Sequence, residues 1–98
     1  MAPKLIAKRY ILEGKVQGVG CRAQVLELAL QIGHLSGFVM NLPDGRVAVE
    51  VKGPDWRVKD FEGVLEAKLN PPVQVTQLLK EEIPMEQLSQ TGFVIKRD

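Results

Sequence analysis

The chain has 98 residues, of which 45% are hydrophobic and 26% charged, so we expect one globular domain over residues 1–98. Thirteen basic and 12 acidic residues leave a net charge of +1. This near balance argues against nucleic acid as the main partner, because phosphate backbones are usually met by a basic surface.

Other features of the sequence exclude further classes of protein. No apolar run approaches the roughly 20 residues of a membrane-spanning helix, and the N-terminal residues lack the apolar segment of a signal peptide. The single cysteine, Cys21, excludes a disulfide within the chain and favours a reducing compartment, so we expect a cytoplasmic protein. One histidine and one cysteine cannot form the usual zinc site. We therefore expect no metal, no cofactor and no membrane partner.

In chain order, the first two predicted elements are a strand and a helix. Leu5 to Glu13 predicts a strand, and its consecutive apolar residues Tyr10 to Leu12 are typical of a central strand covered on both faces. Ala23 to Ile32 predicts a helix, because its apolar residues recur at positions i, i+3, i+4 and i+7. These residues are Val25, Leu28, Ala29 and Ile32. Gly33 follows where helices commonly end in a left-handed residue, and we interpret His34 as a surface or capping histidine.

Ser36 to Asn41 and Arg46 to Lys52 predict the two strands of a hairpin. In the second of these strands every other residue is a valine, which is typical of a strand with one buried face. The intervening Pro43-Asp44-Gly45 supplies the turn, since proline presets φ and glycine accepts a positive φ. Asn41 is then the last strand residue before the turn, a place where asparagine is usually only a turn residue.

A second helix is predicted to begin at Gly53-Pro54-Asp55, because proline is tolerated in the first turn of a helix. Its apolar face comprises Trp56, Val58, Phe61, Val64, Leu65 and Leu69. We interpret the lone Trp56 as a packing anchor, since aromatic side chains dominate core burial. Asn70-Pro71-Pro72 ends this helix.

Val73 to Ile83 predicts a fourth strand, which ends in the solvated residues Glu81 and Glu82 before Pro84. Phe93 to Lys96 predicts a short last strand. The order indicates an α+β fold, a ferredoxin-like α/β sandwich (βαββαβ plus a short final strand) with two helices on one face of a mostly antiparallel sheet. Such a fold by itself says little about function.

A glycine-rich run, Gly14-Lys15-Val16-Gln17-Gly18-Val19-Gly20-Cys21-Arg22, lies between the first strand and the first helix. Glycines let the backbone adopt a positive φ close to a ligand, and a helix N-terminus presents unpaired N–H groups to an anion. Arg22 adds a planar cation that matches two phosphate oxygens. From these residues alone the run is either a phosphate or carboxylate site or a plain tight turn, because it lacks the full pattern of the nucleotide-binding loops.

Two motifs in the sequence resemble those of the acylphosphatase family. They are Val16-Gln17-Gly18-Val19-Gly20-Cys21-Arg22 and Gly37-Phe38-Val39-Met40-Asn41-Leu42-Pro43-Asp44-Gly45-Arg46-Val47. The family shows Val-Gln-Gly-Val-Gly-aromatic-Arg and Gly-x-Val-x-Asn-x-x-Asp-Gly-x-Val at this separation, and the resemblance covers nearly the whole chain. Two residues depart from the pattern: Cys21 replaces the usual aromatic residue, and Met40 stands where the family often has arginine.

The resemblance implies the ferredoxin-like fold and an acylphosphatase, a hydrolase that converts an acylphosphate to a carboxylate and inorganic phosphate without a metal. By its match to the motif, Arg22 would clamp two phosphoryl oxygens, and Asn41 would position the attacking water. Backbone N–H groups of a phosphate-binding loop would hold the remaining oxygens, and that loop comprises Gln17, Gly18, Val19, Gly20 and Cys21. The expected partner is a small-molecule acylphosphate, bound by a monomer.

Two alternatives stay open. Cys21 is either a small packing residue or, beside Arg22 at a helix N-terminus, a thiol with a lowered pKa. A thiol-dependent phosphatase needs its arginine several residues beyond the cysteine, which favours the packing role. The domain itself is either the enzyme or a non-catalytic module of the same fold, which binds phosphate or carboxylate or serves in regulation. A binding module has no evident need of Asn41, so the pair Arg22 and Asn41 favours the enzyme.

Overall fold

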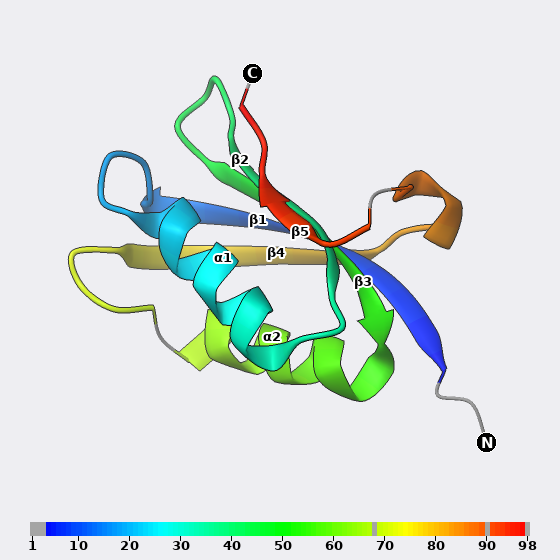
Figure 1. Ribbon diagram of the computed structural model, residues 1–98. Helices are drawn as coiled ribbons and strands as arrows, with labels where there is room; N and C mark the ends of the chain where they lie inside the picture. Colours follow the sequence, from blue (N-terminus) through cyan, green and yellow to red (C-terminus); the bar gives the residue numbers. More distant parts are fainter. Residues whose placement is uncertain (1–3, 68, 90, 98) are drawn as a thin grey trace.

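The computed structural model describes residues 4–67, 69–89 and 91–97. In chain order its elements are β1 (Leu5–Lys15), α1 (Cys21–Ile32), β2 (Ser36–Asn41), β3 (Val47–Pro54), α2 (Asp55–Ala67), β4 (Gln74–Glu82), a 3-10 helix (Met85–Gln87) and β5 (Phe93–Ile95). The strands form a sheet of order β4-β1-β3-β2-β5. All neighbours in the sheet are antiparallel except β2 and β5, which are parallel. Both helices cover one face of this sheet (Figure 1), so the predicted ferredoxin-like fold is confirmed.

The main core lies between the helices and the sheet. Along β1 and β3, every second side chain points toward the helices. The register of these two strands places Tyr10 opposite Val49 and Leu12 opposite Val47. From α2, Phe61 reaches into this layer, with its ring centroid 6.1 Å from that of Tyr10 and 6.0 Å from that of Phe93. All six side chains are buried. Each buried side chain of this size contributes about 1.5–3 kcal/mol.

The opposite face of the sheet is only partly covered. A smaller buried cluster of Ala7, Phe38 and Leu88 lies there, where the segment around the 3-10 helix crosses the sheet. The carboxylate of Glu50 is also buried on this face, and Nη1 of Arg9 donates to its Oε2 at 2.9 Å. The central strands therefore have neighbours on both faces over part of their length, which accounts for the poor alternation in β1.

Several element boundaries differ from those predicted. β1 continues to Lys15 because a β-bulge between Glu13 and Gly14 lets its pairing with β4 go on where the alternation of the sequence is lost. α1 begins at Cys21, two residues before the periodic pattern, so Arg22 belongs to the first turn of the helix. α2 begins at Asp55 and ends at Ala67, and Leu69 lies beyond the helix but is still buried.

The remaining strands differ from prediction by one or two residues at their ends. β3 covers Val47–Pro54, β4 covers Gln74–Glu82 and β5 ends at Ile95. The 3-10 helix was not predicted, because a single turn of helix shows no periodicity.

The interpretation of Trp56 as a core anchor was wrong. Its side chain is 53% exposed, and the guanidinium of Arg57 lies 4.3 Å from the centroid of its ring. The buried stripe of α2 consists of Val58, Phe61 and Leu65. Trp56 precedes Val58 by two residues, and a spacing of two places side chains on nearly opposite sides of a helix.

Gly37 in β2 is a site where the fold requires glycine. Its φ is 142°, and a Cβ there would overlap the carbonyl oxygen of Glu50 on β3. We expect Gly37→Ala to destabilise the protein by at least about 3 kcal/mol, because overpacking and a left-handed backbone each add a cost. Gly63→Ala is the matched control: it lies in α2 with open space around it and should stabilise by about 0.5–1 kcal/mol. Urea unfolding measures the free energy of unfolding of both variants. Equal changes in the two variants would contradict the requirement for glycine at position 37.

Candidate active site

The strand directions bring three chain segments to one edge of the sheet. β1 and β2 are both antiparallel to β3, so they run in the same direction, and β5 is parallel to β2. The C-terminal ends of β1, β2 and β5 therefore meet at one edge, which is also where α1 begins (Figure 1). This shared direction brings the glycine-rich run and Asn41 to the same place.

The loop between β1 and α1 is held open by two glycines with positive φ, Gly18 at 75° and Gly20 at 81°. Gly20 is the N-cap of α1, and no side chain caps the helix there. Gln24 is the first helical residue whose N–H reaches back, to the carbonyl of Gly20 at 3.1 Å. Within the described residues, the backbone N–H groups from Gly18 to Ala23 make no hydrogen bond to the protein. They form a row of free donors at the positive end of the helix dipole.

This loop forms one side of a cavity of about 220 Å³. The cavity is lined by Val16, Gly18, Gly20, Cys21, Arg22, Ala23, Asn41, Ile95 and Arg97. Arg22 and Asn41, the two residues predicted to act together, thus share one cavity. Of the other predicted loop residues, Gln17 and Val19 do not line it. Arg97 was missed by the sequence analysis, since no motif includes it.

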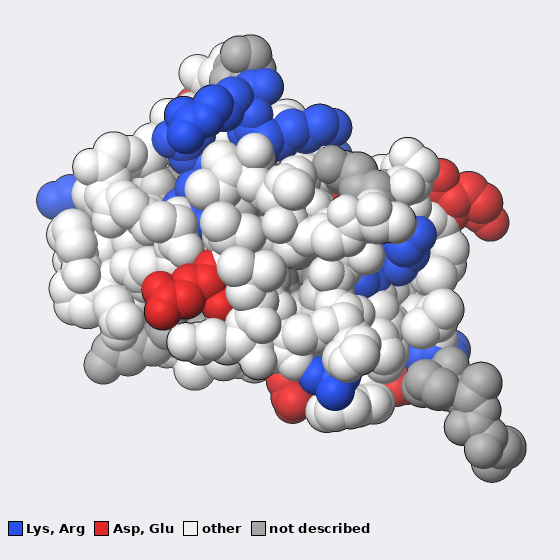
Figure 2. Space-filling view, in the orientation of Figure 1, with Lys and Arg blue, Asp and Glu red and all other residues white. Residues whose placement is uncertain are grey.

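Two arginines, Arg22 and Arg97, line the cavity, and no acidic residue is among its described lining residues. Lys and Arg side chains gather over this end of the molecule, where the β2–β3 turn and the segment after β5 lie side by side (Figure 2). Backbone donors and fixed positive charge in one cavity fit an anion with several oxygens, such as a phosphoryl group.

Asn41 contributes a different group to the cavity. Its side-chain oxygen Oδ1 is buried, and it has no hydrogen-bond partner among the described residues. A buried acceptor without a partner costs about 1–3 kcal/mol, so such groups call for an explanation. A ligand or a water molecule that donates a hydrogen bond would supply the missing partner.

Gln17 turns away from the cavity and holds the β2–β3 turn. Its Nε2 donates to the carbonyl oxygens of Leu42 at 2.8 Å and Arg46 at 2.9 Å. Asn41 immediately precedes Leu42, so one side chain ties the loop between β1 and α1 to the strand end that carries Asn41. The turn is further closed by Arg46, whose Nε lies 2.8 Å from Oδ2 of Asp44.

A family model described as Acylphosphatase matches residues 8–95. The chain belongs to the acylphosphatase family. The family predicted from the two motifs is therefore confirmed, and with it the prediction of a hydrolase acting on acid anhydrides, at the level of the family.

Individual acylphosphatases match over most of the chain or over part of it. One from Caldivirga maquilingensis is 40% identical over 92 residues, which make up 92% of this chain and 93% of that protein. The acylphosphatase from Thermus thermophilus is 52% identical over 59 residues, 60% of this chain and 62% of that protein. The crystal structure of acylphosphatase from Bacillus subtilis superimposes with a TM-score of 0.83 at 32% identity, covering 95% of this chain and 99% of that one.

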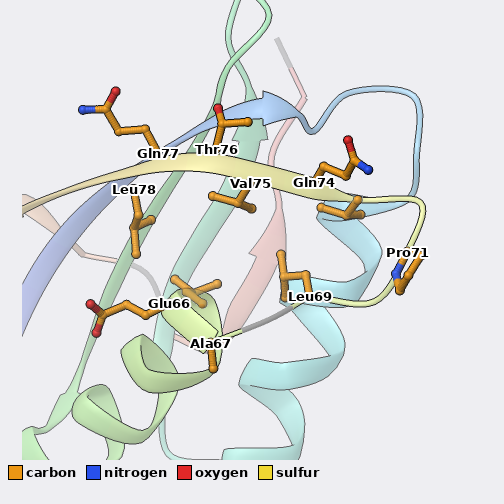
Figure 3. Close-up of a pocket in the computed structure, with 11 residues that line it drawn as sticks. Glu66, Ala67, Leu69, Pro71, Gln74, Val75, Thr76, Gln77 and Leu78 are labelled. Atoms are coloured by element: carbon orange, nitrogen blue, oxygen red, sulfur yellow. The ribbon is translucent and has the colours of Figure 1, made fainter.

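A second hollow among the described residues of this acylphosphatase-family chain has a different lining. A hollow of about 490 Å³ lies between the end of α2 and β4 (Figure 3), lined by leucines, valines and glutamines, and none of its described lining residues is basic. His34 lies on the surface just after α1, away from the cavity. In the described part of the chain no three His, Cys, Asp or Glu side chains group around a possible metal position. None of the described helices is long and apolar enough to cross a membrane.

Cys21 stands where the acylphosphatase family usually has an aromatic residue. Its side chain is 2% exposed and packs in the main core. Burial raises the pKa of its thiol to about 11. At neutral pH the group is therefore an uncharged thiol, and both observations favour the packing role over the nucleophile.

The thiol of Cys21 should be chemically inert in the folded protein. At pH 7 we expect iodoacetamide to modify it only as fast as the protein unfolds, because only the thiolate reacts and the side chain is buried. Cys21→Ala should lower the free energy of unfolding by about 1 kcal/mol. Mass spectrometry measures the rate at which iodoacetamide labels Cys21. Rapid labelling of a fully folded sample would show that the thiol is not inert.

Removal of the Gln17 amide should loosen the turn beside Asn41. We expect Gln17→Leu to cost about 1–3 kcal/mol, the sum for two lost hydrogen bonds, and to speed amide hydrogen exchange between residues 41 and 47. Gln24→Leu is the control, since it also loses two side-chain bonds to backbone, both with Asn70, away from the cavity. It should cost a similar amount and leave exchange at residues 41–47 unchanged. If both variants changed that exchange alike, Gln17 would not be the specific tie.

Proposed function

We propose that this chain hydrolyses acylphosphates to a carboxylate and inorganic phosphate, with no metal and no covalent nucleophile. The observation that carries the proposal is the buried, unpartnered Oδ1 of Asn41 in the same cavity as Arg22 and the free backbone donors of the loop. A site that only bound phosphate would need the donors and the arginine, whereas an unpartnered acceptor adds nothing to the binding of an anion. An acceptor at this place suits a water molecule.

The phosphoryl group is held by Arg22 and by the start of α1. The planar guanidinium donates two parallel hydrogen bonds to two phosphoryl oxygens, a contact that a lysine cannot reproduce. N–H groups of the loop from Gln17 to Cys21 bind the remaining oxygens, and the helix dipole adds to their positive potential. Phosphoryl transfer depends chiefly on such positioning and neutralisation of charge, because the acylphosphate is already activated.

Asn41 holds the attacking water. Its Oδ1 accepts a hydrogen bond from the water, whose oxygen then faces the phosphorus opposite the acyl oxygen. The water oxygen forms a bond to phosphorus while the bond from phosphorus to the acyl oxygen breaks, and the electron pair leaves with the carboxylate. An asparagine amide does not titrate near neutral pH, so the proton of the water passes to a phosphoryl oxygen of the substrate. The products are one carboxylate and one inorganic phosphate, and the thiol of Cys21 takes no part.

The proposed setting is a monomer in the cytoplasm that acts on a small molecule. A cavity of about 220 Å³ accommodates a phosphoryl group with a small acyl group rather than a macromolecule. A net charge of +1 is not the strongly basic balance typical of domains that bind nucleic acid.

The experiment compares Asn41→Ala and Arg22→Ala on benzoyl phosphate in the presence of excess EDTA. The parent should release phosphate at an unchanged rate with or without EDTA. Asn41→Ala should keep its affinity for inorganic phosphate and lose about 10²–10³-fold in kcat, the usual cost of one preorganised polar contact. Arg22→Ala should lose both phosphate affinity and turnover, and Arg22→Lys should recover little.

Asn70→Ala serves as the control, because Asn70 is an exposed asparagine outside the cavity, and it should behave as the parent. Circular dichroism verifies that each variant is folded. A folded Asn41→Ala protein with parental kcat would remove asparagine from the mechanism. A parent that binds phosphate tightly and never releases it from benzoyl phosphate would favour the non-catalytic binding module instead.

A further inference from the structure

We propose that Arg97 is a second cation of the phosphoryl site, which contacts the phosphoryl group from the side opposite the loop. This inference rests on the proposed function and adds a binding residue that lies outside both sequence motifs. The family model ends at residue 95, so Arg97 also lies beyond the part of the chain that it matches.

The backbone after β5 is held in a defined place beside β2. β5 pairs in parallel with β2, with Val39 opposite Ile95, and the N–H of Lys96 donates to the carbonyl of Val39 at 2.9 Å. Continuing this register by two residues places Arg97 beside Asn41. Both residues line the cavity, in agreement with that register.

Side chains from Val94 to Arg97 point alternately to the two faces of the sheet. Ile95 packs against the main core on the helix side, whereas Val94 is 41% exposed. Lys96 points to the face without helices, where its Nζ lies 4.5 Å from the ring centroid of Phe38. Arg97, two residues after Ile95, returns to the helix side, where the cavity lies.

The arginines outside the cavity all have a protein partner. Arg9 pairs with Glu50, Arg46 with Asp44, and Arg57 donates to the carbonyl of Ile32. By contrast, neither Arg22 nor Arg97 forms an ion pair or a side-chain hydrogen bond with any described residue. Two arginines that line one cavity and have no partner among the described residues repel each other unless an anion lies between their charges. A doubly charged phosphoryl group is an anion of the right size and charge for both.

The test removes one positive charge at either of two adjacent positions. Arg97→Gln and Lys96→Gln change the net charge equally, but only the first residue faces the cavity. The affinity for inorganic phosphate is measured by calorimetry, and kcat/KM is measured on benzoyl phosphate. We expect Arg97→Gln to weaken phosphate binding by about ten-fold, as for a charge-assisted hydrogen bond, and Lys96→Gln by less than about two-fold. Arg97→Lys should lie between the parent and Arg97→Gln.

The outcomes separate this inference from the proposed function. If the parent binds phosphate and hydrolyses benzoyl phosphate while Arg97→Gln matches Lys96→Gln in both measurements, the role of Arg97 is overturned and the proposed function stands. If the parent binds no phosphate, both are overturned. A folded Arg97→Gln protein with selectively weakened phosphate binding supports the second cation, and thermal unfolding verifies that the two variants are equally folded.

Discussion

The first turn of α1 provides the interaction on which the site depends. The first N–H groups of a helix have no partner within the helix, and leaving them unpaired costs free energy. In most helices a serine, threonine, aspartate or asparagine at the N-cap accepts one of these hydrogen bonds. Here the N-cap is Gly20, and the loop before it is shaped by positive φ at Gly18 and Gly20, so the donors stay available. An anion can do what a capping side chain would otherwise do, and Arg22 in that same turn brings the matching charge.

The sheet supplies the rest of the site through strand direction rather than through local sequence. Because β1, β2 and β5 run the same way, the loop, Asn41 and Arg97 are carried to one edge. Gln17 then fixes the spacing between two of these segments with a single side chain. The buried residues Cys21, Val25 and Ala29 of α1 belong to the same core as the strand residues, so close packing holds the start of this helix against the sheet.

The sequence predicted those features that depend on neighbours along the chain. The periodicity of Ala23–Ile32, the valines of β3 and the Pro43-Asp44-Gly45 turn give the elements and their order. The two motifs predicted Arg22 and Asn41 as site residues. This prediction came from the resemblance to the family, because the periodicity of apolar residues carries no information about chemistry. Trp56 was misplaced, since a residue two positions before Val58 lies on nearly the opposite side of the helix from the buried stripe.

Features that depend on long-range pairing were not predictable in the same way. The side-chain amide of Gln17 donates to carbonyl groups of a turn far along the chain. Such a contact produces no pattern in the sequence from which it could be predicted. Arg97 enters the cavity only because β5 pairs in parallel with β2, and the sequence does not specify which strand a three-residue segment joins. The bulge at Gly14 likewise depends on its partner strand, β4.

The central claim is that a water held by Asn41 attacks phosphorus. Hydrolysis of benzoyl phosphate in water enriched in oxygen-18, corrected for the spontaneous reaction, tests this claim most directly, because the label marks the atom that is attacked. We predict that a single turnover places the label in inorganic phosphate and leaves benzoate unlabelled. Label in benzoate would mean attack at the acyl carbon, and it would contradict the roles given to Arg22, Asn41 and the loop.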